Sequence, residues 1–180
     1  MNSYLHSIQK LFTFYKKLGE DAINQLTGEQ LLWKPGEESN SIANIIQHLS
    51  GNMMSRFTDF LTTDGEKPWR NRDAEFEDQI KSKDELLQQW EKGWSILFNT
   101  INNLKAGDLE KIIYIRNEGH TVLEALNRQL AHYAYHTGQM VFIAKHLAGS
   151  NWKTLSIAKG KSGEFNEKKF NSPPEKKHFV

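Results

Sequence analysis

Two histidines near the end of the last long helical stretch have the spacing of a metal-binding pair. The sequence AHYAYHTGQ, residues 131–139, places His132 and His136 four residues apart. On an α-helix this spacing puts two side chains on one side, with Cβ atoms roughly 5–6 Å apart. Neutral imidazole is the commonest metal ligand among side chains. The pair is compatible with a metal ion, but His-x-x-x-His without an intervening glutamate is a weak signal, and spacing alone favours solvated histidines or polar residues at a seam.

A third histidine, His48, lies far upstream in the apolar-periodic stretch SIANIIQHLSGNMMSRF. If its helix neighbours the helix of His132 and His136, three imidazoles can converge on one divalent ion. Three protein ligands leave at least one coordination position open for water or substrate, which is typical of catalytic metal sites. Because no thiolate or carboxylate belongs to the pattern, the metal stays open among Zn, Ni, Fe and others.

The three histidines lie beside the apolar stripes of their helices rather than on them, when the sequence is projected at about 100° per residue. Their strips also carry amide side chains, which are Asn44 and Asn52 beside His48, and Gln129 and Gln139 beside the pair. Two interpretations follow. In the first, the histidines are exposed to solvent or lie at a seam between helices or subunits. In the second, they line a recessed polar cleft. In the cleft the four amides are candidates for contacts to the ligands or to substrate, and no general base is evident.

Four stretches with helical periodicity must position these residues. They cover residues 3–26, a second stretch from Ser39 or Ser41 to about Leu61, a third from Ser82 to about Leu104, and a fourth from Thr121 to about Leu147. Capping boxes are predicted at Ser82–Glu85 and Thr121–Glu124, and Gly149 ends the last helix. With no sustained strand pattern, the expected fold is all-α, a four-helix bundle over residues 1–150.

Two connections and a tail complete the chain. Residues 62–81 form a long loop, in which PWRNRD carries Arg70 and Arg72; these can bind an anionic group, but ion pairs within the loop are favoured. KIIYIRNEGHTV predicts a small hairpin or extended turn around residues 117–119, before the fourth helix. Residues 151–180 form a Lys-rich tail, expected to pack partly on the bundle through Trp152 and other apolar residues.

Composition bounds the function. The chain has 180 residues, 38% of them hydrophobic, a net charge of +1 and no cysteine. This favours one globular domain and gives no general attraction to nucleic acid or to a membrane surface. There is no disulfide, thiolate site or cysteine nucleophile, which fits a reducing compartment. No signal peptide or membrane span is evident, so we expect a cytoplasmic protein.

The chain resembles the DinB/YfiT-like family of small bacterial four-helix proteins, and within it a Bacillus-type branch without an assigned function. The resemblance covers about residues 1–150 and rests on LLWKPGEESNSIANIIQHLSGNM, PWRNRD and IRNEGHTVLEALNRQLAHYAYHTGQMVFIAKHLAG. It implies a bundle with a long crossover connection, often a homodimer. It also implies one divalent metal ion, usually Zn or Ni, on His48, His132 and His136.

The resemblance implies thiol-dependent chemistry, since characterised relatives include bacillithiol S-transferases and a mycothiol-dependent maleylpyruvate isomerase. Two hypotheses therefore stand. The first is a metal-dependent enzyme acting on a small molecule, with transfer of a low-molecular-weight thiol as the leading reaction and hydrolysis as the second. The alternative is a non-enzymatic binding or stress-response module. The sequence alone does not decide whether the protein is an enzyme.

Overall fold

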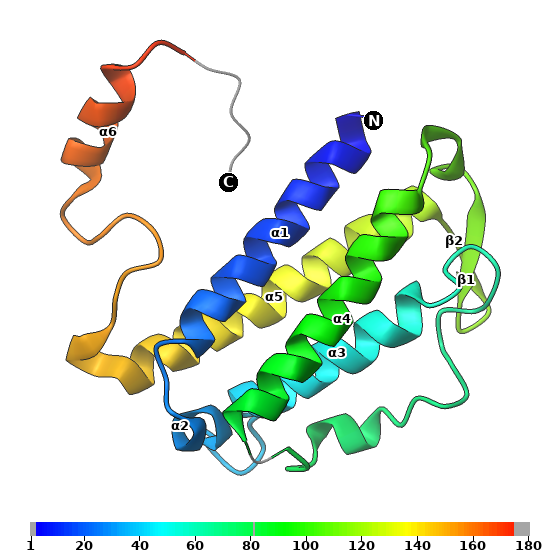
Figure 1. Cartoon of the computed structure of the whole chain (residues 1–180), viewed down its shortest axis with the longest axis horizontal. Helices are drawn as coiled ribbons and strands as arrows, with labels where there is room; N and C mark the ends of the chain where they lie inside the picture. The colour runs from blue at the N-terminus through cyan, green and yellow to red at the C-terminus, as the bar shows by residue number, and fades with distance from the viewer. Residues whose placement is uncertain (1–2, 81, 175–180) are drawn as a thin grey trace.

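The computed structural model describes residues 3–80 and 82–174, and its core is a bundle of four helices (Figure 1). They are α1 (Ser3–Ile23), α3 (Ile42–Phe57), α4 (Lys83–Asn103) and α5 (Val122–Ala148). The side chains that fill the core are large, and they include Phe12, Trp90, Trp94 and Tyr133, each at most 2% exposed. The predicted all-α fold is confirmed.

The order of the helices requires a long return connection. Both α1 and α3 pack against α4 and α5. In Figure 1, α3 and α4 run in one direction, whereas α1 and α5 run in the other. Because α3 and α4 are parallel, the chain between them must travel back along the bundle. This connection, described over residues 58–80, is the predicted crossover; its short 3-10 helix η1 (Asp73–Phe76) packs on α3.

The crossover makes α3 a helix that is buried on all sides. Every residue of α3 except Met54 is buried, including the polar side chains of Asn44, His48 and Asn52. The interpretation of His48 as a solvated surface histidine is therefore wrong. Periodicity could not exclude it, because the segment that covers this face has no periodic pattern.

Some helix boundaries differ from the predictions. The first predicted helix is broken after Ile23, and a separate short helix α2 (Gly28–Leu32) follows, started by a capping box of Thr27 with Gln30. Of the two predicted start positions for α3, Ser41 caps the helix. The helix ends at Phe57 rather than near Leu61, because the backbone turns at Asp59, where φ is 50°.

The predicted caps of the later helices are largely present. Thr121 and Glu124 form a complete capping box at the start of α5, and Gly149, with φ 53°, ends that helix. At the start of α4, the side chain of Ser82 accepts a hydrogen bond from the backbone of Glu85. These local hydrogen bonds fix where each helix begins.

A hairpin joins α4 to α5, after a 3-10 turn η2 (Ala106–Asp108). Its strands are β1 (Ile112–Ile115) and β2 (Glu118–Thr121), which pair antiparallel. The turn is Arg116-Asn117, with φ of 57° and 61°, rather than the predicted residues 117–119. Asp64 of the crossover holds this left-handed turn, since its carboxylate accepts both backbone N–H groups at 2.9 Å. Hairpin and crossover are thereby tied together.

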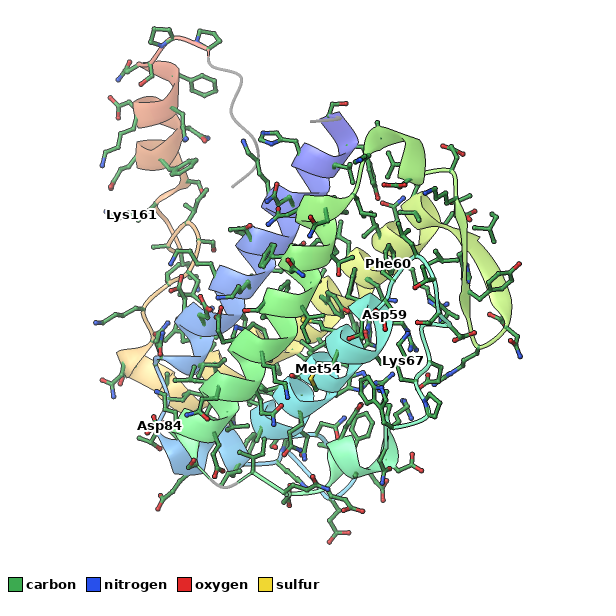
Figure 2. All side chains as sticks on the ribbon, turned by 45° about the vertical axis from the view of Figure 1, so that its right-hand side comes forward. Met54, Asp59, Phe60, Lys67, Asp84 and Lys161 are labelled. Carbon is green, nitrogen blue, oxygen red and sulfur yellow. The ribbon has the colours of Figure 1, made fainter. Side chains whose placement is uncertain are left out.

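The C-terminal segment leaves the bundle after a 3-10 turn, η3 (Gly149–Asn151). Trp152 and Leu155 pack against the core, whereas helix α6 (Ser162–Phe170) is exposed along its length. Figures 1 and 2 show residues 161–174 standing away from the bundle. The division into a domain of residues 1–150 and a tail stays a prediction, and residues 175–180 lie outside the described residues. No described helix is long and apolar enough to cross a membrane.

Candidate metal centre

Three histidines from two helices meet between α3 and α5. His48 projects from α3, and His132 and His136 project from α5 on successive turns. One ring nitrogen from each lies within 4.8 Å of the other two. His48 Nε2 is 3.2 Å from His132 Nε2. Zinc–nitrogen bonds of about 2.0–2.1 Å in a tetrahedral site separate ligand nitrogens by about 3.3 Å. The spacing of these imidazoles thus suits one divalent ion.

The outer nitrogens of two of these rings are held by acceptors. Glu75 Oε2 lies 2.9 Å from His48 Nδ1, and Gln139 Oε1 lies 2.8 Å from His136 Nδ1. Carboxylate and amide oxygens only accept hydrogen bonds, so each Nδ1 must carry the proton. This tautomer leaves the lone pair on Nε2, the nitrogen that a metal would bind. Such outer contacts orient metal-binding histidines in known sites.

Burial keeps the α5 histidines neutral. Burial, followed by the nearby His136 and His48, lowers the pKa of His132 to about 3. Burial also lowers the pKa of His136 to about 4; His48 acts in the same sense, against the opposing hydrogen bond to Gln139. Both rings are therefore uncharged at neutral pH. This is the protonation state that binds a metal.

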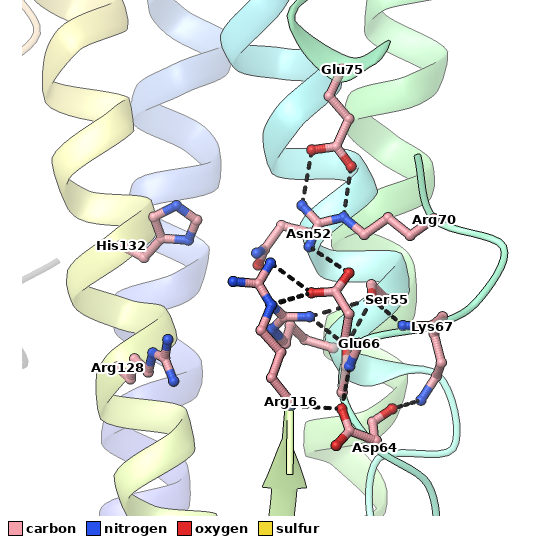
Figure 3. A network of polar contacts seen from close by, with 12 residues as sticks. Asn52, Ser55, Asp64, Glu66, Lys67, Arg70, Glu75, Arg116, Arg128 and His132 are labelled. Atoms are coloured by element: carbon pink, nitrogen blue, oxygen red, sulfur yellow. Dashed lines mark hydrogen bonds and ion pairs between the residues drawn. The ribbon is translucent and has the colours of Figure 1, made fainter. Parts of the chain in front are cut away.

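Glu75 is the residue of the site that the sequence analysis missed. It lies in η1 of the crossover and also accepts two hydrogen bonds from Arg70, at 2.7 Å to Nε and 2.9 Å to Nη2 (Figure 3). Burial raises the pKa of Glu75, but the hydrogen bonds from His48 and Arg70 outweigh burial and hold this pKa below its usual value. The carboxylate is thus ionised beside His48. The favoured ion pairs of Arg70 within the loop are confirmed, with Glu75 and Glu66.

A glycine on α3 makes room for this carboxylate. A Cβ added to Gly51 would lie 2.2 Å from Glu75 Oε1 and 2.8 Å from its Cδ. Any other residue at this position would push Glu75 away from His48. Periodicity reveals neither the need for a glycine at position 51 nor the position of Glu75, because Glu75 lies in an irregular segment. The one sequence signal for Glu75 was its position five residues after Arg70, which suggested an ion pair within the loop.

The amide side chains of α3 hold the crossover over His48. Asn44 Nδ2 donates to the backbone oxygens of Phe76 and Glu77, at 3.1 and 3.3 Å. Gln47 Nε2 donates to the backbone oxygens of Glu75 and Glu77, at 3.0 and 2.9 Å. The ring of Phe76 stacks on His48 with centroids 4.9 Å apart. Asn44, a predicted site residue, therefore positions the loop rather than the histidines directly.

The other three predicted amides occupy different environments. Gln139 contacts His136 as described above. Asn52 Oδ1 accepts a hydrogen bond from the hydroxyl of Tyr133 at 2.9 Å. Gln129 is 3% exposed, and its Oε1 has no hydrogen-bond partner among the described residues. A cavity of about 200 Å³ opens beside Asn52 and Gln129, and His48 and His132 line it as well.

The fold and the site define an all-helical bundle with a candidate three-histidine metal centre. The chain belongs to the family described as "Protein of unknown function (DUF1572)", whose model matches residues 1–161. The match covers the bundle, the crossover and all three histidines. No curated protein and no solved structure matches the chain.

Proposed function

We propose that this protein is a metal-dependent enzyme in which His48, His132 and His136 hold one divalent ion, Zn or Ni. The observation that carries the proposal is the convergence of three imidazoles from two helices, with one ring nitrogen of each within 4.8 Å. The acceptors at Nδ1 of His48 and His136 support it, because they leave Nε2 free to bind. A set of three protein ligands leaves a position for a reactant.

A divalent ion held there would lower the pKa of a thiol or of water at its open position, which supplies a nucleophile at neutral pH. The chain has no cysteine, so a reacting thiol must come from another molecule. Transfer of such a thiol to an electrophile is the leading reaction, favoured by the resemblance to DinB/YfiT-like proteins, and hydrolysis is the second. Within the chain, Glu75 and Gln139 orient two of the rings. Phe76 shields one face of His48 from water.

Metal analysis of protein purified without a histidine tag tests the centre. We expect a stoichiometric divalent metal in the wild type and its loss in His132→Ala and in His136→Ala. The matched control is His146→Ala, because His146 lies on the same helix but is exposed and contacts the ring of Trp33. Folded wild-type protein that takes up no divalent metal would overturn the proposal.

Turnover is tested separately. Metal-loaded protein is incubated with bacillithiol or a surrogate thiol and a chromogenic electrophile, and conjugate formation is followed. We expect turnover that disappears in His132→Ala and persists in His146→Ala. If no divalent ion supports transfer or hydrolysis, the metal-bound bundle is a binding module instead.

A further inference from the structure

All five arginines of the chain line one cavity. They are Arg56, Arg70, Arg72, Arg116 and Arg128, and the cavity of about 200 Å³ that they share opens onto His48 and His132. None of the described lysines lines it, although the chain contains far more lysine than arginine. The planar guanidinium group binds carboxylates and phosphates in a bidentate manner, which a lysine ammonium cannot do. The use of arginine rather than lysine around this cavity indicates that it binds an anion.

The arginines outnumber their acidic partners. Glu66 pairs with Arg56 at 3.2 Å, with Arg116 at 2.9 Å and with Arg70 at 3.7 Å. Glu75 pairs with Arg70 as well. Asp64 is occupied by backbone N–H groups of the hairpin turn. Two carboxylates thus serve three guanidinium groups, and a positive excess remains in the cavity.

Two arginines have no acidic partner within the described part of the chain. Arg128 lies one turn before His132 on α5, and its one hydrogen-bond contact is with His120 Nε2 at 3.4 Å. Arg72 lies over the ring of Phe76, 5.2 Å from its centroid, and Phe76 itself stacks on His48. In Figure 3, Arg128 and His132 face the Glu66 network from the opposite helix. The unpaired cations therefore lie close to the histidines.

Neutral hydrogen-bonding groups complete the cavity. Gln129 is 3% exposed, and its Oε1 lacks a partner among the residues that the structure describes. A buried acceptor without a partner is costly, and a hydroxyl or N–H group on a natural ligand, which the succinate probe used below lacks, would relieve that cost. The volume corresponds to roughly seven water molecules at about 30 Å³ each. This is room for a small organic acid.

From these observations we infer that the cavity binds a small carboxylate-bearing substrate, with its anionic group on Arg72 and Arg128. The inference rests on the proposed function for the role of the ligand as a substrate. The geometry seats the anion beside His48 and His132, so a neighbouring atom of the same molecule reaches the metal centre. Glu66 keeps Arg56 and Arg116 in place at the wall of the cavity, and Asp64 fixes the turn that presents Arg116.

The test is calorimetric titration of succinate into metal-free and metal-loaded protein. We expect saturable binding to both forms, weakened by added salt, because guanidinium groups hold the anion. Arg72→Gln and Arg128→Gln are expected to weaken binding roughly tenfold to a hundredfold, the effect of losing a charge-assisted hydrogen bond. Arg128→Lys keeps the charge but loses the bidentate contact, so its affinity should fall between those of the wild type and Arg128→Gln. Both arginines are exposed, so the variants should fold normally.

The control variant is Lys145→Gln, which removes an exposed cation from α5 outside the cavity. It should bind succinate like the wild type, and neutral succinamide should not bind. Absence of saturable binding to the metal-free protein, or equal weakening by Lys145→Gln, would overturn the inference. Tighter binding of inorganic phosphate than of succinate, lost in Arg72→Gln and Arg128→Gln, would overturn the carboxylate assignment. Metal content measured on each variant separates these outcomes from a failure of the metal centre.

Discussion

Replacing Glu75 by glutamine tests whether the crossover controls the metal centre. In the wild type, Glu75 Oε2 accepts from His48 Nδ1 at 2.9 Å and from Arg70 Nη2 at 2.9 Å, while Oε1 accepts from Arg70 Nε at 2.7 Å. Glutamine has one oxygen for these three donors. If its oxygen faces His48, its amide N–H₂ opposes Arg70. If the amide is flipped, His48 Nδ1 must become an acceptor, and the proton moves to Nε2, the nitrogen that should bind metal.

Either arrangement weakens metal binding. Loss of a carboxylate that holds a metal-binding histidine typically lowers metal affinity by about 10- to 100-fold, or about 1.4–2.8 kcal/mol. Arg70, whose side chain is 2% exposed, also loses the nearer of its two carboxylate partners and keeps only Glu66, so the variant should unfold more easily, by about 1–3 kcal/mol. Both effects have one structural origin but separate measurements.

The assays are a competition titration of Zn²⁺ or Co²⁺ for affinity, and urea unfolding of the metal-free protein for stability. Glu77→Gln is the control, because Glu77 lies in the same segment with an exposed side chain. We expect wild-type affinity and stability for this control. If Glu75→Gln binds metal within twofold of the wild type while losing stability, then Glu75 supports only the fold, and the reasoning about the His48 tautomer is wrong.

Three further predictions follow from other contacts. Gly51→Ala should lower metal affinity, measured by titration, because the added methyl group displaces Glu75. Gly138→Ala has open space at its Cβ and should raise the free energy of unfolding by up to about 1 kcal/mol, measured by urea unfolding. Burial raises the pKa of Glu66, but Arg56 and the neighbouring arginines outweigh burial and hold this pKa below 4.5. The ion pairs of Glu66 therefore stabilise the fold above about pH 4.5, and this stabilisation is lost as the pH falls through the lowered pKa. Glu66→Gln should therefore be less stable at pH 7 and show a weaker loss on acidification, whereas an unchanged urea midpoint at pH 7 would contradict this account. Deletion of residues 162–180 should leave the thermal midpoint and metal affinity unchanged, because α6 is exposed along its length; a lower midpoint would show that the segment supports the bundle.

The helices and the three histidines were predictable because both depend on local pattern. Apolar periodicity revealed the four bundle helices, and Ser41, Thr121 and Gly149 mark boundaries through their own hydrogen bonds or backbone angles. The spacing of His132 and His136 follows from helix geometry alone. Their meeting with His48 was an expectation that depended on which helices are neighbours.

The surroundings of the histidines were not predictable in the same way. Glu75 lies 27 residues from His48 in an irregular segment, and only the return path of the crossover brings the two together. The gathering of arginines likewise needs the hairpin turn, which supplies Arg116, to meet α5, which supplies Arg128. Such contacts arise from tertiary arrangement, so no period in the sequence encodes them. The short helix α2 and the exposed helix α6 were missed because each has too few apolar residues to show a stripe.

The crossover separates the proposed metal ligands from the group that orients one of them. The proposed ligands belong to α3 and α5, which are fixed by the packed core, whereas the partner that orients His48 belongs to an irregular segment held by side-chain amides. Substitutions in that segment can therefore change metal affinity or the preferred metal while the ligand set and the bundle stay constant. In evolutionary terms, one scaffold can be tuned to different metals or reactants by altering a single stretch of about twenty residues.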